Sequence, residues 1–541
     1  MERASDYCSL KRGEAERREA GRREGGEAGR RNVWLTVIPA LSVGLLTSCN
    51  GARQSDGEKL ARTYCAACHA FPEPQLLDKQ TWQSGVLPQM AQRLGIGTNT
   101  LAEAMSRNPL MTVLPVKVSD QDWEKIVAYY LAGAPDKLPD QALPAQPQLD
   151  PPFFRPQAFA TGMKSSGITT LLKIDSTHQR IFIGDAGANT LSVFDFDRQL
   201  LSTLTLGSPP TDLIVDGESV LVLESGILNP NDEPRGSVVR YDFAGHDSLK
   251  SPVVVIDSLY RPVFFQQFDF DKDGRNEIVI CEFGDNRGRL ALYKYNGAKY
   301  ERHVLDATPG AIRFELHDMT GDGSPDIVAL FAQADERIEL FDNDGKGHFS
   351  GEHRVLARFP PVYGSMYFSM HDFNGDGRLD ILYVNGDNFD YSRILKPYHG
   401  IRILENDGKN NFKERYFFPI YGAAQAVVAD FDKDGDLDIM TTSNFADPAR
   451  HPERGIMYFE NTGHYQFRPY AFSAASANQW NVMAVGDLNK DGWPDVVVGA
   501  MDLGSIAKFQ RQYSASPLTT TKDPILFFEN ASYPRLNQGA H

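Results

Sequence analysis

The sequence is poor in cysteine, in basic charge and in catalytic motifs, and each shortage excludes a class of protein. Five cysteines in 541 residues are too few for a disulfide scaffold. Asp and Glu outnumber Lys and Arg by 71 to 55, and no basic stripe with interleaved aromatic residues is present. A chain with a formal net charge of −16 repels nucleic acid and favours cations or basic partners. The sequence also contains no nucleophile elbow, no HExxH motif and no phosphate-binding loop.

Long apolar runs are also missing, and the longest candidate lies near the N-terminus. Residues 1–31 are rich in Arg, Glu and Gly and are predicted to be disordered. Residues 33–46 form an apolar stretch that is too short for a comfortable membrane span but suits a signal peptide. The stretch ends in Leu46-Thr47-Ser48-Cys49, which resembles the lipobox of bacterial lipoproteins. An ordinary signal peptide with an incidental cysteine is the alternative.

The lipobox resemblance implies that Cys49 becomes the first, lipidated residue of an exported chain, anchored to a membrane through its lipid. Asn50 follows it, where an Asp would suggest retention at the inner membrane. We therefore expect the outer membrane or the cell surface, with the periplasmic face as the alternative.

Only one pair of cysteines then remains as a candidate functional site. Cys8 would be removed with the signal peptide, and Cys281 lies in the apolar run "EIVICEF", where it is predicted to be a small buried hydrophobic residue. Only Cys65 and Cys68 are left, two residues apart.

The pair belongs to the motif Cys65-Ala66-Ala67-Cys68-His69, the attachment signature of c-type haem. A zinc site would normally need a second Cys/His pair, which the sequence lacks. A thioredoxin-like pair would follow a strand, whereas the upstream "SDGEKLARTY" is predicted to be helical. Pairing of the two thiols with each other is the remaining alternative.

Residues 49–135 resemble a small monohaem cytochrome c domain. Pro72 and Pro74 follow the motif, and "DWEKIVAYYLAGAP" is predicted to be an amphipathic helix that begins at Ser119. The resemblance implies a covalent haem on Cys65 and Cys68, with His69 as an axial ligand of the iron and a proline carbonyl orienting its imidazole.

The second axial ligand is predicted to be a methionine, because thioether sulfur suits electron transfer. Met90 lies in the family-like context "TWQSGVLPQM", so we expect Met90 to bind the iron. Met111, shortly before the predicted last helix, is the alternative.

An acidic motif then recurs five times, and its spacing reveals a repeat. The copies are "DFDKDGRNEIVI" at 269, "DMTGDGSPDIVA" at 318, "DFNGDGRLDILY" at 372, "DFDKDGDLDIMT" at 430 and "DLNKDGWPDVVV" at 487. Each places oxygen side chains at positions 1, 3, 5 and 9 and a glycine at position 6, a pattern suited to Ca²⁺. A β-strand is predicted after each copy, and position 12 lacks the Glu of an EF-hand.

The predicted calcium ligands are Asp269, Asp271, Asp273 and Glu277; Asp318, Thr320, Asp322 and Asp326; Asp372, Asn374, Asp376 and Asp380; Asp430, Asp432, Asp434 and Asp438; and Asp487, Asn489, Asp491 and Asp495.

These repeats resemble the FG-GAP/VCBS repeats of β-propellers, which implies four strands per blade. Two upstream units have the same strand order without the acidic loop, so we expect about seven blades. The predicted fold is therefore multi-domain: a small all-α cytochrome c domain followed by an all-β propeller. The boundaries are 1–48 for the pre-region and signal peptide, 49–135 for the cytochrome domain, 136–160 for a Pro-rich linker, 161–535 for the propeller and 536–541 for a tail.

The sequence therefore predicts a membrane-anchored, extracytoplasmic cytochrome that transfers single electrons through haem c to or from a redox partner protein. The calcium-stabilised propeller would dock that partner or a substrate. One alternative is a haem-coupled dehydrogenase that oxidises a sugar or alcohol in the propeller, and another is an adhesive surface protein.

Overall fold

The computed structural model describes residues 55–96, 118–159, 162, 166–245, 248–349, 353–387, 394–501 and 524–531. Its first part is helical and its second part is built from strands. No helix in these described stretches is both long and apolar enough to cross a membrane.

The helical part contains short helices and turns. They are α1 (Asp56–Tyr64), η2 (Cys65–Ala67), η3 (Pro74–Leu76), α2 (Lys79–Thr81), the short π-helical turn η4 (Trp82–Val86), α3 (Leu87–Arg93) and α5 (Asp120–Gly133). The predicted start of the last helix is confirmed, because the Ser119 side chain accepts a hydrogen bond from the Asp122 backbone N–H.

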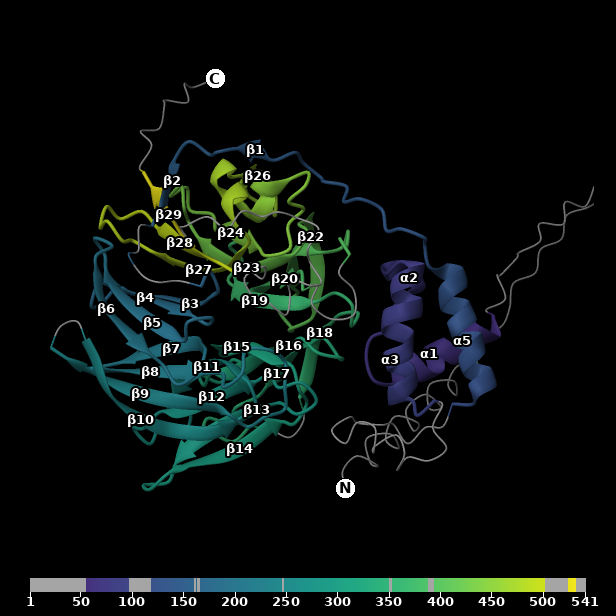
Figure 1. Ribbon diagram of the computed structural model, residues 1–541, viewed down its shortest axis with the longest axis horizontal. Helices are drawn as coiled ribbons and strands as arrows, with labels where there is room; N and C mark the ends of the chain where they lie inside the picture. Colours follow the sequence, from purple (N-terminus) through teal and green to yellow (C-terminus); the bar gives the residue numbers. More distant parts are fainter. Residues whose placement is uncertain are drawn as a thin grey trace, which may run out of the picture. The chain divides into compact units, whose positions relative to one another are not determined.

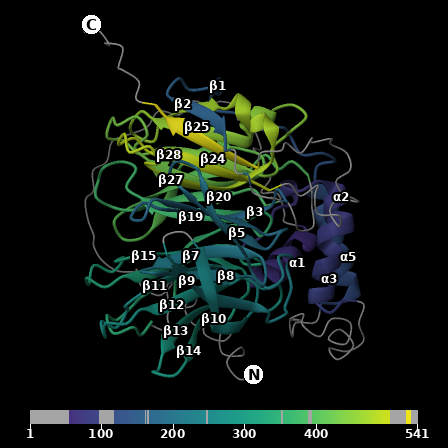
Figure 2. The ribbon, with the colours of Figure 1, turned by 60° about the vertical axis from the view of Figure 1, so that its left-hand side comes forward.

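Helices α1 and α5 contact each other, and a glycine sets their approach (Figure 2). A Cβ atom on Gly57 would lie 2.4 Å from the Lys125 carbonyl oxygen, so only glycine fits there. Around this contact Ile126, Tyr130 and Trp82 are fully buried, and the rings of Trp82 and Tyr130 lie 4.4 Å apart. These residues form the centre of an apolar cluster in the helical part.

Within the described residues the strands form seven sheets, six of four strands and one of five, and each contains a four-stranded blade of a propeller (Figure 1). Neighbouring innermost strands contact each other around the ring, including β27 with β3. The blades contain the following strands: β3 (Thr169–Asp175), β4 (Arg180–Asp185), β5 (Thr190–Asp195) and β6 (Leu200–Thr205); β7 (Pro210–Asp216), β8 (Ser219–Glu224), β9 (Gly236–Ala244) and β10 (Ser248–Leu259); β11 (Pro262–Phe268), β12 (Glu277–Glu282), β13 (Arg289–Tyr295) and β14 (Tyr300–Asp306); β15 (Ala311–His317), β16 (Asp326–Phe331), β17 (Arg337–Phe341) and β18 (Arg354–Arg358); β19 (Ser365–His371), β20 (Asp380–Asn385), β21 (Gly400–Asn406) and β22 (Phe412–Pro419); β23 (Ala423–Ala429), β24 (Asp438–Ser443), β25 (Ile456–Asn461) and β26 (Phe467–Ala471); and β27 (Trp480–Gly486), β28 (Asp495–Ala500) and β29 (Ile525–Asn530) with β2 (Phe154–Ala158).

The predicted seven blades are therefore confirmed, with the two blades before residue 262 lacking the acidic loop. In all seven blades the pairing of the first two strands shifts register just after the first residue of the inner strand. The second strands β12, β16, β20, β24 and β28 are buried at every residue, because neighbouring blades cover both of their faces.

The predicted linker 136–160 is corrected at its C-terminal end. Phe154–Ala158 forms β2, which pairs antiparallel with β29 and supplies the outermost strand of the last blade (Figure 1). The two-residue strand β1 (Gln148–Leu149) pairs with β26. Pro156 made this stretch resemble a linker, but an outer edge strand tolerates proline because no further strand needs its N–H.

The strand β2 closes the ring, and Phe154 anchors it. The Phe154 ring is 5% exposed and lies 5.4 Å from the Tyr458 ring and 5.5 Å from the Phe431 ring. We predict that Phe154→Ala lowers the free energy of unfolding by about 3–5 kcal/mol, measured by urea denaturation, because a buried aromatic ring is lost. Leu149→Ala, at a side chain 59% exposed, is the matched control and should change it by less than about 0.5 kcal/mol. Equal losses would show that β2 does not close the propeller.

Candidate haem-attachment motif and acidic loops

The Cys-Ala-Ala-Cys-His motif begins where α1 ends. Ser55 caps α1, and Asp56 and Glu58 lie in its first turn, where carboxylates favour helix formation. Cys65 opens the one-turn helix η2, so the two cysteines follow α1 on a continuous helical turn. Neither cysteine is in a disulfide, and Cys65 is half-buried whereas Cys68 is exposed.

Burial governs the protonation of the motif's side chains. It raises the pKa of the Cys65 thiol to about 11, so Cys65 is a neutral thiol at neutral pH. Burial also lowers the pKa of His69, which favours the neutral imidazole that a metal requires.

The carbonyl that contacts the imidazole is not the one predicted. His69 Nδ1 lies 2.9 Å from the Ala70 carbonyl oxygen. The Pro72 carbonyl instead accepts a hydrogen bond from the Tyr130 hydroxyl at 3.0 Å, and the Pro74 carbonyl accepts one from Trp82 Nε1 at 2.8 Å. The two prolines therefore fasten the chain after the motif to α5 and η4.

The structure places one of the two predicted methionine ligands. Met90 lies on α3, half-buried, in the same apolar cluster as Cys65 and Phe71. Met111 lies outside the described residues, as do Cys8 and Cys49. Cys281 is fully buried on β12, as predicted.

The five acidic segments share one backbone conformation. Each joins the first and second strands of its blade, in blades 3 to 7. In every copy the glycine at position 6 has φ between 81° and 100°, and its N–H donates to the carboxylate at position 1 over 2.7–3.1 Å. The N–H of position 7 donates to the carboxylate at position 5. The carboxylates at positions 1 and 5 therefore have the same orientation in all five loops.

The carboxylate at position 9, called the closing carboxylate, binds the start of each loop. Glu277, Asp326, Asp380, Asp438 and Asp495 are all buried, and each accepts the N–H of position 2. In blades 4 to 7 a second bond comes from the N–H of an asparagine that ends or follows the third strand: Asn343, Asn406, Asn461 or Asn530. Sequence reasoning missed these asparagines, although each follows an acidic residue in the repeated dipeptides Asp-Asn and Glu-Asn.

Burial of several carboxylates in one place opposes their ionisation. It raises the pKa of Asp438 to about 8 and the pKa of Asp495 to about 6. Burial, followed by the negative charge of Asp434, raises the pKa of Asp432 to about 6. A bound divalent cation would stabilise these carboxylates in their charged form.

Two oxygens next to these loops have no hydrogen-bond partner among the described residues. They are Oδ1 of Asp487, at position 1 of the last loop, and Oδ1 of Asp342, directly after β17, whose negative charge acts on Asp326. Buried carboxylate oxygens normally have a partner, so both observations fit a cation at these loops. Carboxylate ligand atoms lie within 4.8 Å of one another in two of the loops, at Asp269, Asp271 and Asp273 and at Asp430, Asp432 and Asp438.

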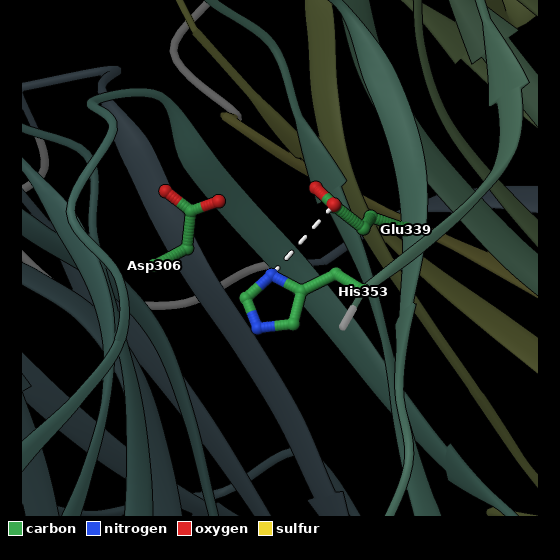
Figure 3. Close-up of side chains that lie close together, drawn as sticks. All are labelled: Asp306, Glu339 and His353. Carbon is green, nitrogen blue, oxygen red and sulfur yellow. Dashed lines mark ion pairs between the residues drawn. The ribbon is translucent and has the colours of Figure 1, made fainter. Parts of the chain in front are cut away.

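A third cluster of possible ligands lies away from the loops, at Asp306, Glu339 and His353 (Figure 3). His353 Nδ1 lies 3.7 Å from Glu339 Oε1. The guanidinium of Arg337 already pairs with both carboxylates, at 2.7 Å from Asp306 and 2.5 Å from Glu339. Because Arg337 already pairs with both carboxylates, this cluster is an ion-pair network between blades 3 and 4.

Two glutamates end the second strands of blades 2 and 3, Glu224 on β8 and Glu282 on β12. Their carboxylates are engaged within the propeller. Glu224 accepts from Ser208 N–H at 2.8 Å and from the Tyr241 hydroxyl at 2.9 Å. Glu282 accepts from Tyr260 N–H and the Tyr293 hydroxyl, both at 2.8 Å. These groups therefore stabilise the blades.

The chain matches family models over part of its length. An FG-GAP-like repeat matches residues 269–329 and 318–383, and an FG-GAP repeat matches residues 480–511. These segments contain four of the five acidic loops. No curated protein matches the chain.

Solved structures resemble the chain only distantly. BBS1N in complex with ARL6DN is 9% identical, with 71% of this chain and 98% of that chain covered and a TM-score of 0.42. A structure of S. cerevisiae dbp5 bound to nup159 and gle1 is 11% identical, with 72% and 98% covered and a TM-score of 0.39. The Myceliophteria thermophila Cps50 (Swd1) β-propeller domain is 11% identical, with 63% and 96% covered and a TM-score of 0.38. Such likeness says nothing about ligands. The chain is thus a seven-bladed β-propeller that carries FG-GAP repeats, preceded by a short helical segment.

Proposed function

We propose that this protein is a c-type cytochrome that transfers single electrons outside the cytoplasm, with the propeller as its docking platform. One observation carries the proposal: the motif begins at Cys65 directly after α1, with both cysteines on one helical turn. Neither thiol is used in a disulfide, and the described residues offer no further cysteine or histidine pair beside them for zinc.

The donor set around the motif fits a covalent haem. Cys65 and Cys68 provide the two thiols that would form thioethers. His69 provides a neutral imidazole whose Nδ1 contacts the Ala70 carbonyl, so Nε2 would be the nitrogen that binds iron. A haem attached there would supply one-electron oxidation and reduction of its iron.

Met90 would complete the axial ligands. It is half-buried in the apolar cluster that contains Cys65, so the thioether would have partly apolar surroundings. A thioether in such surroundings favours the reduced iron and raises the reduction potential.

The propeller would bind Ca²⁺ at its acidic loops, and the ion would be structural. The shared loop geometry, the raised carboxylate pKa values and the partnerless oxygens of Asp342 and Asp487 support this assignment. The rigid ring would then present its surface to a redox partner protein. Because the carboxylates of Glu224 and Glu282 are engaged within the blades, we do not assign a dehydrogenase site to them.

The location of the protein rests on the sequence before residue 54. We propose that Cys49 is lipidated and anchors the chain to the outer membrane or the cell surface, since an exported chain is what covalent haem attachment requires.

The attachment site is tested by removing the two thiols. We predict that Cys65→Ala/Cys68→Ala, expressed in a host that matures c-type cytochromes, loses all haem that survives denaturing electrophoresis, because no thioether can form. Haem staining of the gel and the pyridine haemochrome spectrum measure this. Cys281→Ala, at the buried cysteine of β12, is the control and should keep the full stain. Stain that persists in the double variant, or is missing from the wild type, would contradict the proposal.

The methionine ligand is tested by absorption spectroscopy of the oxidised protein. We predict that Met90→Ala abolishes the weak sulfur-to-iron charge-transfer band at the red end of the spectrum and lowers the reduction potential, because the thioether is lost. Met319→Ala, in the propeller, should leave both unchanged. A band that survives in Met90→Ala and disappears in Met111→Ala would assign the ligand to Met111.

The calcium loops are tested by thermal unfolding. We predict that EGTA lowers the melting temperature and that Ca²⁺, but not Mg²⁺ at the same concentration, restores it, with the visible haem spectrum unchanged. A ligand at 100 times its dissociation constant stabilises by about 2.7 kcal/mol per site. Asp487→Asn should reproduce part of the loss, whereas Asp257→Asn, at an exposed residue of β10 in a blade without an acidic loop, should not. An identical melting curve in EGTA would exclude structural calcium.

A further inference from the structure

The first acidic loop differs from the other four in the residue that faces its closing carboxylate. The strand register pairs Ile278 with Tyr293, so the next pair along is Glu277 with Lys294. The same step in the later blades gives pairs of two acidic residues: Asp326 with Asp342, Asp380 with Glu405, Asp438 with Glu460, and Asp495 with Glu529. A lysine therefore stands in blade 3 where every later blade has a carboxylate.

The Lys294 ammonium points into the loop. Its Nζ forms an ion pair with Asp271 and lies 3.7 Å from Glu277 Oε1 and 3.9 Å from Asp273 Oδ2. It thus contacts three of the four carboxylates that were predicted to bind calcium there. The fourth, Asp269, accepts the N–H groups of Asp273 and Gly274.

No other loop has a comparable internal cation among the described residues. In the third loop Arg378 pairs with Asp376, but it comes from position 7 of the same loop and contacts only that one carboxylate of the four. In the first loop the facing residue is thus an ammonium group that contacts loop carboxylates. In the later loops it is a carboxylate, which at Glu405 pairs with Arg415 and at Glu460 pairs with Arg468, both outside the loops.

Two further substitutions accompany the lysine. The closing residue is Glu277 in the first loop and Asp in the other four. Tyr295, 38% exposed, stands where the other blades have the asparagine whose N–H binds the closing carboxylate. The carboxylates of Asp269, Asp271 and Asp273 still converge as those of the fourth loop do, so the loop differs chiefly in what neutralises it.

We propose that Lys294 is the built-in cation of the first loop, so that the protein binds Ca²⁺ at the four loops 318–326, 372–380, 430–438 and 487–495 and not at 269–277. A Ca²⁺ ion could enter the first loop only by expelling the ammonium or by lying beside a like charge. The inference rests on the proposed function in one respect, because it assumes that the other four loops take calcium.

The calcium content of the purified protein tests the proposal. After equilibrium dialysis against Ca²⁺, we expect four calcium ions per chain in the wild type by elemental analysis. Lys294→Glu restores the acidic residue of the other blades and should bind five. Lys299→Glu makes the same change of charge at an exposed turn residue of the same blade and should bind four. Five ions in the wild type, or four in Lys294→Glu, would overturn the proposal.

A second measurement tests the role of Lys294 even if the protein binds no calcium. In EGTA, Lys294→Ala should melt at a lower temperature than the wild type, because three carboxylates lose their cation, whereas Lys299→Ala should melt with the wild type. Equal melting of the two variants would overturn the role of Lys294. If the protein binds no calcium but Lys294→Ala is destabilised, the calcium assignment of the other loops is rejected. The role of Lys294 as the cation of the first loop then stands.

Discussion

Each acidic loop depends on one buried carboxylate, which binds the backbone of its blade and also adds a buried negative charge. Asp326 shows how: one oxygen accepts the N–H of Met319 within its own loop, and the other accepts the N–H of Asn343 after the third strand. A single side chain therefore fastens the connection between strands one and two to the hairpin beside it. The same carboxylate is fully buried and its pKa is raised, first by burial and then by the charge of Asp342, so a nearby cation would favour its charged form. For the later blades we propose an external ion in that place, whereas in blade 3 we assign it to Lys294.

The propeller has a second requirement, which is that its first strand pairs with its last blade. The last blade has only three strands from the C-terminal part of the chain, and β2 from residues 154–158 supplies the fourth. The propeller therefore cannot close until its first and last strands pair, and the aromatic cluster around Phe154 stabilises that pairing. Rigidity of the ring follows from this closure together with the buried second strands, and a rigid ring suits a docking platform.

Much of the propeller fold could be predicted from the sequence, because a repeated sequence motif implies a repeated structural unit. Five copies of the acidic motif gave the strand order, and two degenerate copies gave seven blades. The strand β2 was missed because Pro156 and its neighbours have the composition of a linker, and only pairing with a distant strand makes them β. Lys294 was missed because it lies 17 residues from Glu277 in sequence and meets it only through the strand register. In the helical part the capped last helix was predicted correctly, but the carbonyl that contacts His69 was not, since hydrogen bonds to Trp82 and Tyr130 already engage the proline carbonyls.

The central claim is that the thiols of Cys65 and Cys68 carry a covalent haem. Proteolysis of the protein purified from its native membrane, followed by mass spectrometry of the peptide that contains both cysteines, tests it most directly. The account predicts a peptide heavier by one haem, with neither thiol open to alkylation. An unmodified peptide with two alkylated cysteines, or one whose cysteines form a disulfide, would contradict it.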